Sequence, residues 1–305
     1  MRIETIDLNF IDTEQVLASY LILGEGSAAV VETGPTSCLG SLMDGLEKHG
    51  VSEDDVRQVF LTHIHLDHAG ASGNLSELWP NATFYVHELG YPHMVDPSKL
   101  VKSAGRIFGE DRMERLWGEV RPVPEERIVK LKGGGEEGEA ADGVLSGYYT
   151  PGHAYHHLVF QEARSGTLFA GDVAGIRRPG QAYVLPPTPA PEVDVEAWKG
   201  SIETMRGLSP SVVCPTHFGV YDDVDRHLSE LERRLQEWLL FVEKRLDAGL
   251  SKEDMIEEFG AMCETELLRE GASREDIEHY QRITGAYEVQ LTGLVRYVSR
   301  LRENA

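Results

Sequence analysis

The sequence is poor in cysteine, contains no long apolar run and has no basic N-terminal leader. Its three cysteines, Cys38, Cys214 and Cys263, are scattered and form no CxxC pair, which excludes a disulfide framework and a thiolate zinc site. No apolar stretch approaches the ~18–20 residues of a transmembrane helix, and the first ten residues lack the pattern of a signal peptide. We therefore expect a cytoplasmic protein that does not act at a membrane.

Positive charge is also scarce. The 305 residues include 29 lysines and arginines against 51 aspartates and glutamates, which gives a formal net charge of −22 at pH 7. Such an acidic surface repels nucleic-acid phosphates and anionic lipids, so we expect no nucleic-acid partner. No GxSxG motif indicates a serine nucleophile. With 41% hydrophobic residues, the chain can still bury a sizeable core.

The first part of the chain moves from consecutive strands to alternating strands and helices, which indicates an α/β fold. The expected strands are 2–9, 14–23, 28–32, 56–63 and 82–88, and the expected helices are 37–49 and 73–79. Residues 89–125 are irregular to helical, and they form either a lid beside a site or a packed insertion.

The second part contains further short strands and a helical end. We expect a solvated turn at 132–143, strands at 144–150, 157–162, 167–171 and 212–215, and a helix at 193–208. Apolar residues at spacings of three and four predict two longer amphipathic helices, 226–247 and 275–302. The stripe of the second helix includes Ile277, Tyr280, Ile283 and Tyr287. These stripes either pack on the chain's own core, form a homodimer interface or line a substrate pocket.

The stretch LTHIHLDHAG at residues 61–70 contains the strongest chemical signal, the motif HxHxDH. Alternate residues of a strand point the same way, so His63 and His65 can project together. Gly70 indicates a turn that brings Asp67 and His68 to a second position. Imidazole and carboxylate groups in this arrangement are ligands for one or two divalent metal ions.

Three isolated residues later in the chain complete this set. His153 follows a strand in TPGHAYHH, Asp172 ends an apolar strand in LFAGDVAG, and His217 has the same position in VVCPTHFG. Each would be an ordinary cap or turn residue on its own. Together with the four residues of the HxHxDH motif, they make seven candidate metal ligands.

This order of motifs resembles the metallo-β-lactamase superfamily over roughly residues 1–222, with 223–305 as a C-terminal helical extension. The resemblance implies a four-layer αβ/βα sandwich whose site lies at one edge between two sheets. It also implies that His63, His65 and His153 bind one metal ion, that Asp67, His68 and His217 bind the other, and that Asp172 bridges them.

Two further residues are interpreted through the same resemblance. The family usually has an aspartate in the early loop where this chain has Glu32, which we interpret as a local adjustment because glutamate can accept the same hydrogen bonds. Some relatives use a tyrosine after the bridging aspartate to donate a hydrogen bond to the substrate carbonyl, which suggests Tyr183. The predicted catalytic residues are thus Asp67, Asp172 and Tyr183.

The resemblance, closest in general layout to glyoxalase II-like and lactonase-like members, implies a dinuclear hydrolase of a small ester, thioester or lactone. Its cofactors would be two divalent metal ions, zinc first, with manganese, iron or nickel as alternatives. Other members of the superfamily suggest a persulfide dioxygenase-like enzyme with one iron, or a phosphodiesterase. A binding or regulatory module that retains a metal is the alternative outside catalysis, and turnover of any substrate would exclude it.

Overall fold

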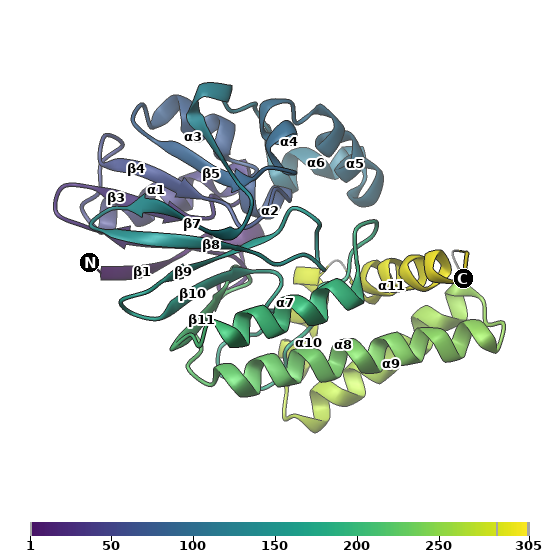
Figure 1. Ribbon diagram of the computed structural model, residues 1–305. Coiled ribbons are helices and arrows are strands. Elements are labelled where there is room, and N and C mark those ends of the chain that lie inside the picture. Colours follow the sequence, from purple (N-terminus) through teal and green to yellow (C-terminus); the bar gives the residue numbers. More distant parts are fainter. Residues whose placement is uncertain (1, 285, 304–305) are drawn as a thin grey trace.

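Two β-sheets packed face to face lie at the centre of the computed structural model, which describes residues 2–284 and 286–303 and, for 282–284 and 286, only the backbone (Figure 1). In this part of the chain, the strand order of the first sheet is β1-β2-β3-β4-β5-β6. Its strands are β1 (Arg2–Asp7), β2 (Ala18–Leu23), β3 (Ala28–Val31), β4 (Val56–Phe60), β5 (Thr83–His87) and β6 (Ile128–Leu131). Pairs from β1 to β3 are antiparallel, and pairs from β3 to β6 are parallel.

The second sheet has the order β11-β10-β9-β8-β7 within the described residues. Its strands are β7 (Gly134–Ala140), β8 (Gly143–Tyr149), β9 (Leu158–Glu162), β10 (Thr167–Gly171) and β11 (Val212–Pro215). Only the β10–β11 pair of this order is parallel, and the helix α7 (Val195–Gly207) lies in the connection between these two strands. A parallel pair needs such a crossover because one strand must return to the starting end of the other.

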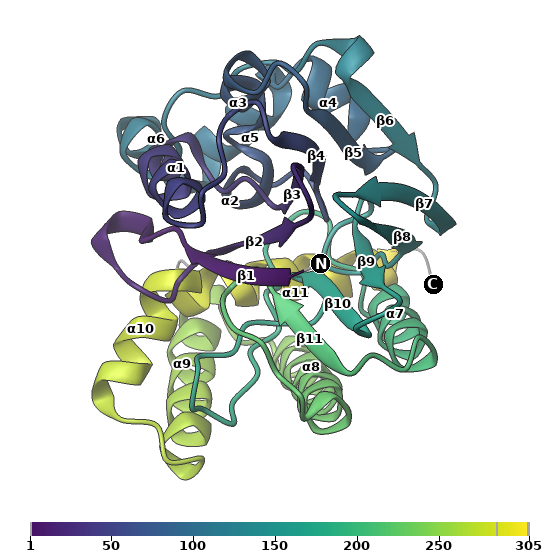
Figure 2. The same ribbon diagram turned by 90° about the vertical axis from the view of Figure 1, so that its left-hand side faces the viewer.

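Helices cover the outer faces of both sheets (Figures 1 and 2). The helices on the outer side of the first sheet are α1 (Leu39–Lys48), α3 (Ser72–Leu78), α4 (Tyr91–Val95), α5 (Ser98–Phe108) and α6 (Glu110–Trp117). The short α2 (Leu66–Ala69) follows β4. The second sheet is covered by α7, α8 (Val224–Asp247), α9 (Lys252–Arg269), α10 (Arg274–Thr284) and α11 (Ala286–Glu303). Short 3-10 turns occupy Phe10–Asp12, Thr36–Cys38 and Glu125–Arg127.

Three apolar cores separate these layers. Along β2, Leu21 belongs to the core beneath the first set of helices, whereas Tyr20 and Ile22 face the second sheet. This alternation follows from the two-residue period of a strand. A third core, which includes Trp198 and Trp238, lies between the second sheet and its helices. The predicted α/β class and the four-layer αβ/βα architecture are therefore confirmed.

The segment 132–143 differs from the prediction of a solvated turn, because β7 runs through it. Its residues do alternate between the two faces, with Glu137 and Glu139 exposed and Gly138 buried against the rings of Phe60 and Tyr85. A glycine faces the core where a strand normally places an apolar side chain, so the hydrophobic pattern of a strand is missing. Its absence made this edge strand look like a loop.

The predicted helix 275–302 is two helices, α10 and α11. Of its predicted stripe, Ile277, Tyr280 and Tyr287 are buried, and the side chain of Ile283 lies outside the described residues. The stripe of α8, with Leu228, Leu231, Leu235 and Trp238, is buried in the third core of the same chain. This packing accounts for the stripe without a second copy, and the homodimer stays a prediction.

Across residues 2–284 and 286–303, no helix combines the length and the apolar character that crossing a membrane requires.

The buried His227 connects α8 to the segment that follows β10. Its Nε2 lies 2.7 Å from the carbonyl oxygen of Ala174, to which it donates a hydrogen bond, and its Nδ1 lies 3.5 Å from the guanidinium of Arg177. Burial, together with the charge of Arg177, lowers the pKa of His227 to about 4. Folding therefore requires the neutral form of this imidazole.

We expect His227 to make the free energy of unfolding fall as the pH drops from about 6.5 towards 4. In that window the unfolded chain, with a histidine pKa near 6.5, binds more protons than the folded chain, and the full effect is about 3 kcal/mol. Urea unfolding of metal-free protein at pH 7 and pH 4.5 should show a steeper loss of stability in the wild type than in His227→Gln. Equal losses in the two proteins would contradict this assignment.

Candidate metal centre

The candidate ligands lie where strands end at one edge of the sandwich. β4 ends at Phe60, three residues earlier than predicted, so His63 and His65 lie in the short connection to α2 rather than in the strand. Asp67 and His68 lie on the first turn of α2. His153 follows β8, Asp172 directly follows β10, and His217 follows β11. The carboxyl ends of these strands thus bring together residues that are far apart in the sequence.

Three histidines form the first cluster. His65 Nδ1 lies 2.9 Å from His63 Nε2 and 3.0 Å from His153 Nε2. Two nitrogens bound to a tetrahedral zinc ion at ~2.0–2.1 Å lie roughly 3.3 Å apart, so this spacing is close to that of a ligand set. An N–H on one ring could serve only one of its neighbours, whereas a shared cation would satisfy all three.

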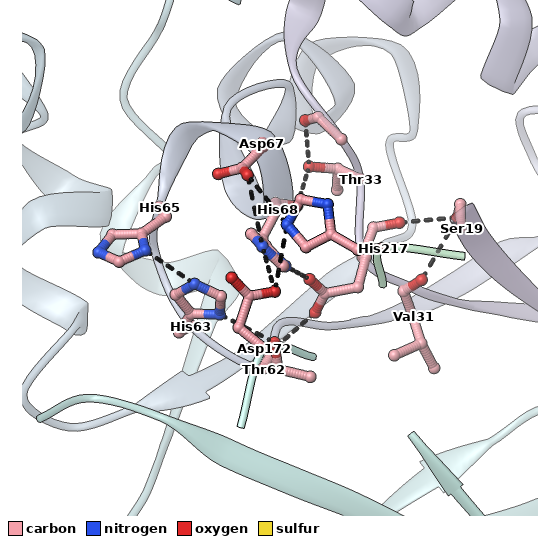
Figure 3. Close-up of polar contacts among 12 residues, drawn as sticks. Ser19, Val31, Thr33, Thr62, His63, His65, Asp67, His68, Asp172 and His217 are labelled. Atoms are coloured by element: carbon pink, nitrogen blue, oxygen red, sulfur yellow. Dashed lines mark hydrogen bonds and ion pairs between the residues drawn. The ribbon is translucent and has the colours of Figure 1, made fainter. Parts of the chain in front are cut away.

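Asp67, His68 and His217 form the second cluster, in which Asp67 Oδ2 lies 3.7 Å from His68 Nε2 and 3.6 Å from His217 Nε2 (Figure 3). His68 Nε2 is buried, and it faces carboxylate oxygens, with Asp172 Oδ1 at 3.1 Å. This donor set also fits a divalent cation.

Asp172 lies between the two clusters. Its Oδ1 is 3.1 Å from His68 Nε2 and 3.4 Å from His217 Nε2, and its Oδ2 is 3.3 Å from His153 Nε2. Figure 3 shows its carboxylate pointing towards the imidazoles of the second cluster. The side chain is almost completely buried, so its charge needs these partners. The structure therefore brings all seven predicted ligands together.

The outward-facing nitrogens of three histidines have partners that fix the orientation of the rings. His63 Nδ1 lies 3.1 Å from Thr62 Oγ1, and His153 Nδ1 donates to the carbonyl oxygen of Pro187 at 2.8 Å. His68 Nδ1 contacts Glu32 Oε2. Such contacts select the tautomer whose other nitrogen faces the metal.

Glu32 also accepts a hydrogen bond from the backbone N–H of Thr62, at 2.6 Å to its other oxygen, Oε1. It lies just after β3 in the left-handed region, with φ 68°, and Ser19 donates a hydrogen bond to its carbonyl oxygen at 2.7 Å. The carboxylate thereby joins the loop of the HxHxDH motif to the end of β3. The longer glutamate still reaches both partners, as the interpretation of a local adjustment requires.

The electrostatic environments of the two clusters differ. Burial, reinforced by neighbouring histidines, holds the pKa of His63 and His65 well below the usual value, and burial also lowers the pKa of His153. Burial also disfavours the charged forms of His68 and His217, but nearby carboxylates, Asp172 first, outweigh it and raise both pKa values. Neutral imidazole is the form that binds metal, so the first cluster is ready for a ligand role at neutral pH.

His157 supports the site without belonging to either cluster. Its Nε2 accepts a hydrogen bond from the backbone N–H of Asp172 at 3.2 Å, and its Nδ1 lies 3.1 Å from Thr150 Oγ1. Gly171, with φ 49°, leaves no room for a side chain, because a Cβ would collide with Thr62 and His157. This close packing fixes the start of the segment that places Asp172.

A cavity of about 310 Å³ opens onto both clusters. One wall comes from α5, and an opposite wall comes from the proline-rich segment 187–192 and from Val289 and Gln290 of α11. The α5 residues that line it are Lys99, Leu100, Ser103, Ala104, Ile107 and Phe108. The segment 89–125 therefore lies beside the site, and its movement as a lid stays a prediction.

The helix α11 is held tightly against this wall. The backbone N–H of Thr188 donates to the side-chain oxygen of Gln290, and Thr188 Oγ1 donates to the Gln290 carbonyl oxygen at 3.0 Å. Gly293 lies so close to the backbone at Thr188 and Pro189 that a Cβ would not fit. The C-terminal extension thus supports the segment whose Pro187 carbonyl orients His153.

The predicted role of Tyr183 does not fit its position. The ring is fully buried in the third core, 3.7 Å from the guanidinium carbon of Arg234, and it does not line the cavity. The nearby basic pair is also turned away from the cavity, because Arg177 pairs with Asp223 and Arg178 pairs with Asp276. The apolar residues around position 183 belong to a core, which their sequence pattern does not distinguish from a pocket.

The sequence interpretation missed the polar pair His156 and Glu192 on the cavity wall. Burial raises the pKa of Glu192 to about 7, although a hydrogen bond from the backbone of Tyr155 opposes this shift. His156 lies close to His153 in the sequence, where a supporting or surface role is the ordinary expectation, whereas Glu192 belongs to no motif. No sequence signal could have paired them.

Fold and site together define a protein with paired His/Asp clusters able to bind divalent metal ions at the edge of an αβ/βα sandwich. The profile of the metallo-beta-lactamase superfamily matches residues 13–217, a region that contains all seven candidate ligands. The chain belongs to the metallo-beta-lactamase superfamily.

Individual relatives are distant. The metallo-beta-lactamase fold-containing protein ST1585 of Sulfurisphaera tokodaii is 25% identical over 228 residues, which cover 72% of this chain and 80% of that protein. The thioesterase pkgB of Emericella nidulans is 27% identical over 202 residues, which cover 65% of this chain and 45% of that protein. The crystal structure of the metallo-beta-lactamase family protein TTHA1429 from Thermus thermophilus is similar, with a TM-score of 0.71 at 23% identity. The similarity covers 99% of this chain and 93% of that chain. That likeness extends over the C-terminal helices.

Replacing Glu32 by glutamine should weaken metal binding. The amide offers one oxygen in place of two, so it cannot accept from both Thr62 and His68, and its NH₂ group would face an N–H donor. Loss of such an orienting partner typically lowers metal affinity ~10–100-fold. Competition with a chromophoric chelator would measure this change. The exposed Glu139→Gln provides the matched control, and an unchanged affinity in Glu32→Gln would refute the supporting role.

Proposed function

We propose that this chain is a dinuclear metal-dependent hydrolase of a small ester, thioester or lactone. The main support is the position of Asp172, whose two oxygens lie within 3.4 Å of histidines from both clusters. A carboxylate shared in this way fits two cations side by side, because each oxygen can serve one of them. Each cluster also has three ligand atoms that lie close together.

Two divalent ions, when bound, lower the pKa of water and polarise a carbonyl oxygen. The residues of the chain perform the remaining tasks. Asp172 fixes the distance between the clusters, and Glu32 and the Pro187 carbonyl keep His68 and His153 oriented. Asp67, whose side chain is 22% exposed, lies at the floor of the cavity, where it can accept a proton from an attacking water.

The cavity favours a small, largely apolar substrate. Its volume of about 310 Å³ is at the lower end of the range for small-molecule sites. Leu100, Ile107 and Phe108 give the α5 wall an apolar part that suits an acyl group, beside the cation Lys99. The turned-away Arg177 and Arg178 make a phosphodiesterase the weaker alternative. The name of the relative pkgB, a thioesterase, agrees with a carbonyl substrate.

The completeness of the second cluster favours two metal ions over the single iron of a persulfide dioxygenase-like enzyme. Histidine and aspartate ligands suit zinc, which we expect, and they also suit manganese, iron or nickel. The expectations of a cytoplasmic location and of no nucleic-acid or membrane partner complete the proposal.

Elemental analysis of protein purified without chelator should give two divalent metal ions per chain. The purified protein should hydrolyse at least one member of a panel of esters, thioesters and lactones. A single iron per chain, with oxygen consumption on a persulfide substrate, would replace the hydrolase by the dioxygenase.

Asp172→Asn should lower kcat/KM for the best substrate by at least ~100-fold, because the amide has only one acceptor oxygen and no charge. The metal content should fall below two per chain, and far-UV circular dichroism should remain that of the wild type. Asp225→Asn, on the exposed side of α8, is the matched control and should keep both activity and metal. Wild-type activity in Asp172→Asn would eliminate the bridging role.

A further inference from the structure

His156 and Glu192 form a polar pair outside the two metal clusters. His156 is only 1% exposed, and neither of its ring nitrogens makes a hydrogen bond within the described part of the chain. Glu192 Oε2 is also buried without a hydrogen bond there, and it lies 3.3 Å from His156 Nε2. His156 Nε2 and Glu192 Oε2 therefore face each other at ion-pair distance, and His156 Nδ1 keeps unused hydrogen-bonding capacity.

The cavity that this pair lines has apolar residues beside polar ones such as Ser103. Pro189, Ala190 and Pro191 precede Glu192 on the same wall, and Leu100 and Ala104 belong to the α5 wall. A buried polar atom without a partner costs free energy, in the range of a lost hydrogen bond. Both His156 and Glu192 line the cavity, so a bound molecule can supply the missing partner.

The pair also lies close to the reacting centre. The ring centroids of His65 and His156 are 5.6 Å apart, and one donor atom each from His65, His156 and Glu192 lies within 4.8 Å of the others. A carbonyl group placed at the first cluster therefore brings the next one or two atoms of its acyl chain against the pair. The carboxyl group of Glu192 offers acceptor oxygens, so it favours a hydrogen-bond donor at that point.

We propose that His156 and Glu192 form a specificity subsite for a hydrogen-bond donor on the substrate. The donor is a hydroxyl or an ammonium group attached to the first or second carbon after the scissile carbonyl. This inference rests on the proposed hydrolase function and defines its substrate class. A carboxylate at the same place is disfavoured, because it would face the carboxylate of Glu192. An apolar substituent leaves His156 Nδ1 without a partner and offers nothing to the free acceptor capacity of Glu192.

The size of the discrimination follows from that unpaired state. Sites built to bind a substrate hydroxyl or N–H reject the analogue that lacks it by factors far above those of a missing methylene, which amount to ~10–200-fold. We expect the wild type to prefer the donor by at least ~100-fold in kcat/KM.

The test uses pairs of nearly isosteric thioesters with metal-loaded enzyme. One pair compares the 3-hydroxybutanoyl with the 3-methylbutanoyl thioester, and the other compares the 2-hydroxybutanoyl with the 2-methylbutanoyl thioester. A 3-aminobutanoyl thioester then separates a cationic donor from a neutral one. In Glu192→Gln, the kcat/KM ratio of donor to methyl substrate should fall about tenfold, because the amide offers one acceptor oxygen in place of two. Glu196→Gln, four residues later and exposed, should keep the wild-type ratio.

The outcomes separate this inference from the proposed function. Turnover of the methyl substrates at the same efficiency as the donor substrates would overturn the subsite alone. An unchanged ratio in Glu192→Gln would do the same. A third metal ion per chain that Glu192→Gln removes would show that His65, His156 and Glu192 form a cation site instead. Absence of turnover on every ester and thioester would overturn the hydrolase and the subsite together.

Discussion

The carboxylate of Asp172 is a buried charge that contacts histidines from three separate parts of the chain. His68 comes from the helix after β4 in the first sheet, whereas His153 and His217 follow β8 and β11 of the second. A buried carboxylate is stable only where such partners surround it. The two sheets must therefore meet at this edge with the ends of their strands in register. Phe60, Phe160 and Phe169 fill the space between the sheets elsewhere, but they do not specify that meeting point.

Around this carboxylate, two of the supporting contacts come from segments that have no ligand of their own. Glu32 follows β3 and holds the loop after β4, and the Pro187 carbonyl fixes His153 from a segment that α11 supports. His157 holds the backbone at Asp172. His63, His68 and His153 are thus constrained from both sides, since each follows a strand and its ring has an orienting partner.

The clustering of the seven candidate ligands could be predicted from the sequence because their residue types are rare at strand ends and their order is distinctive. Tyr183 could not be assigned correctly, since a buried tyrosine beside Arg234 and one beside a substrate have the same local sequence pattern. The strand β7 was missed because Gly138 faces the core in place of an apolar side chain. His156 and Glu192 are separated by more than thirty residues, and only the folded chain places them on one wall.

The close approach of Gly293 to the backbone at Thr188 has a consequence for the order of assembly. Every ligand of the clusters is synthesised before α11, yet the wall that orients His153 is supported only once α11 has docked. During translation, the nascent chain therefore exposes its histidines before they are fully constrained. Docking of α11 then completes the support of the wall that orients His153.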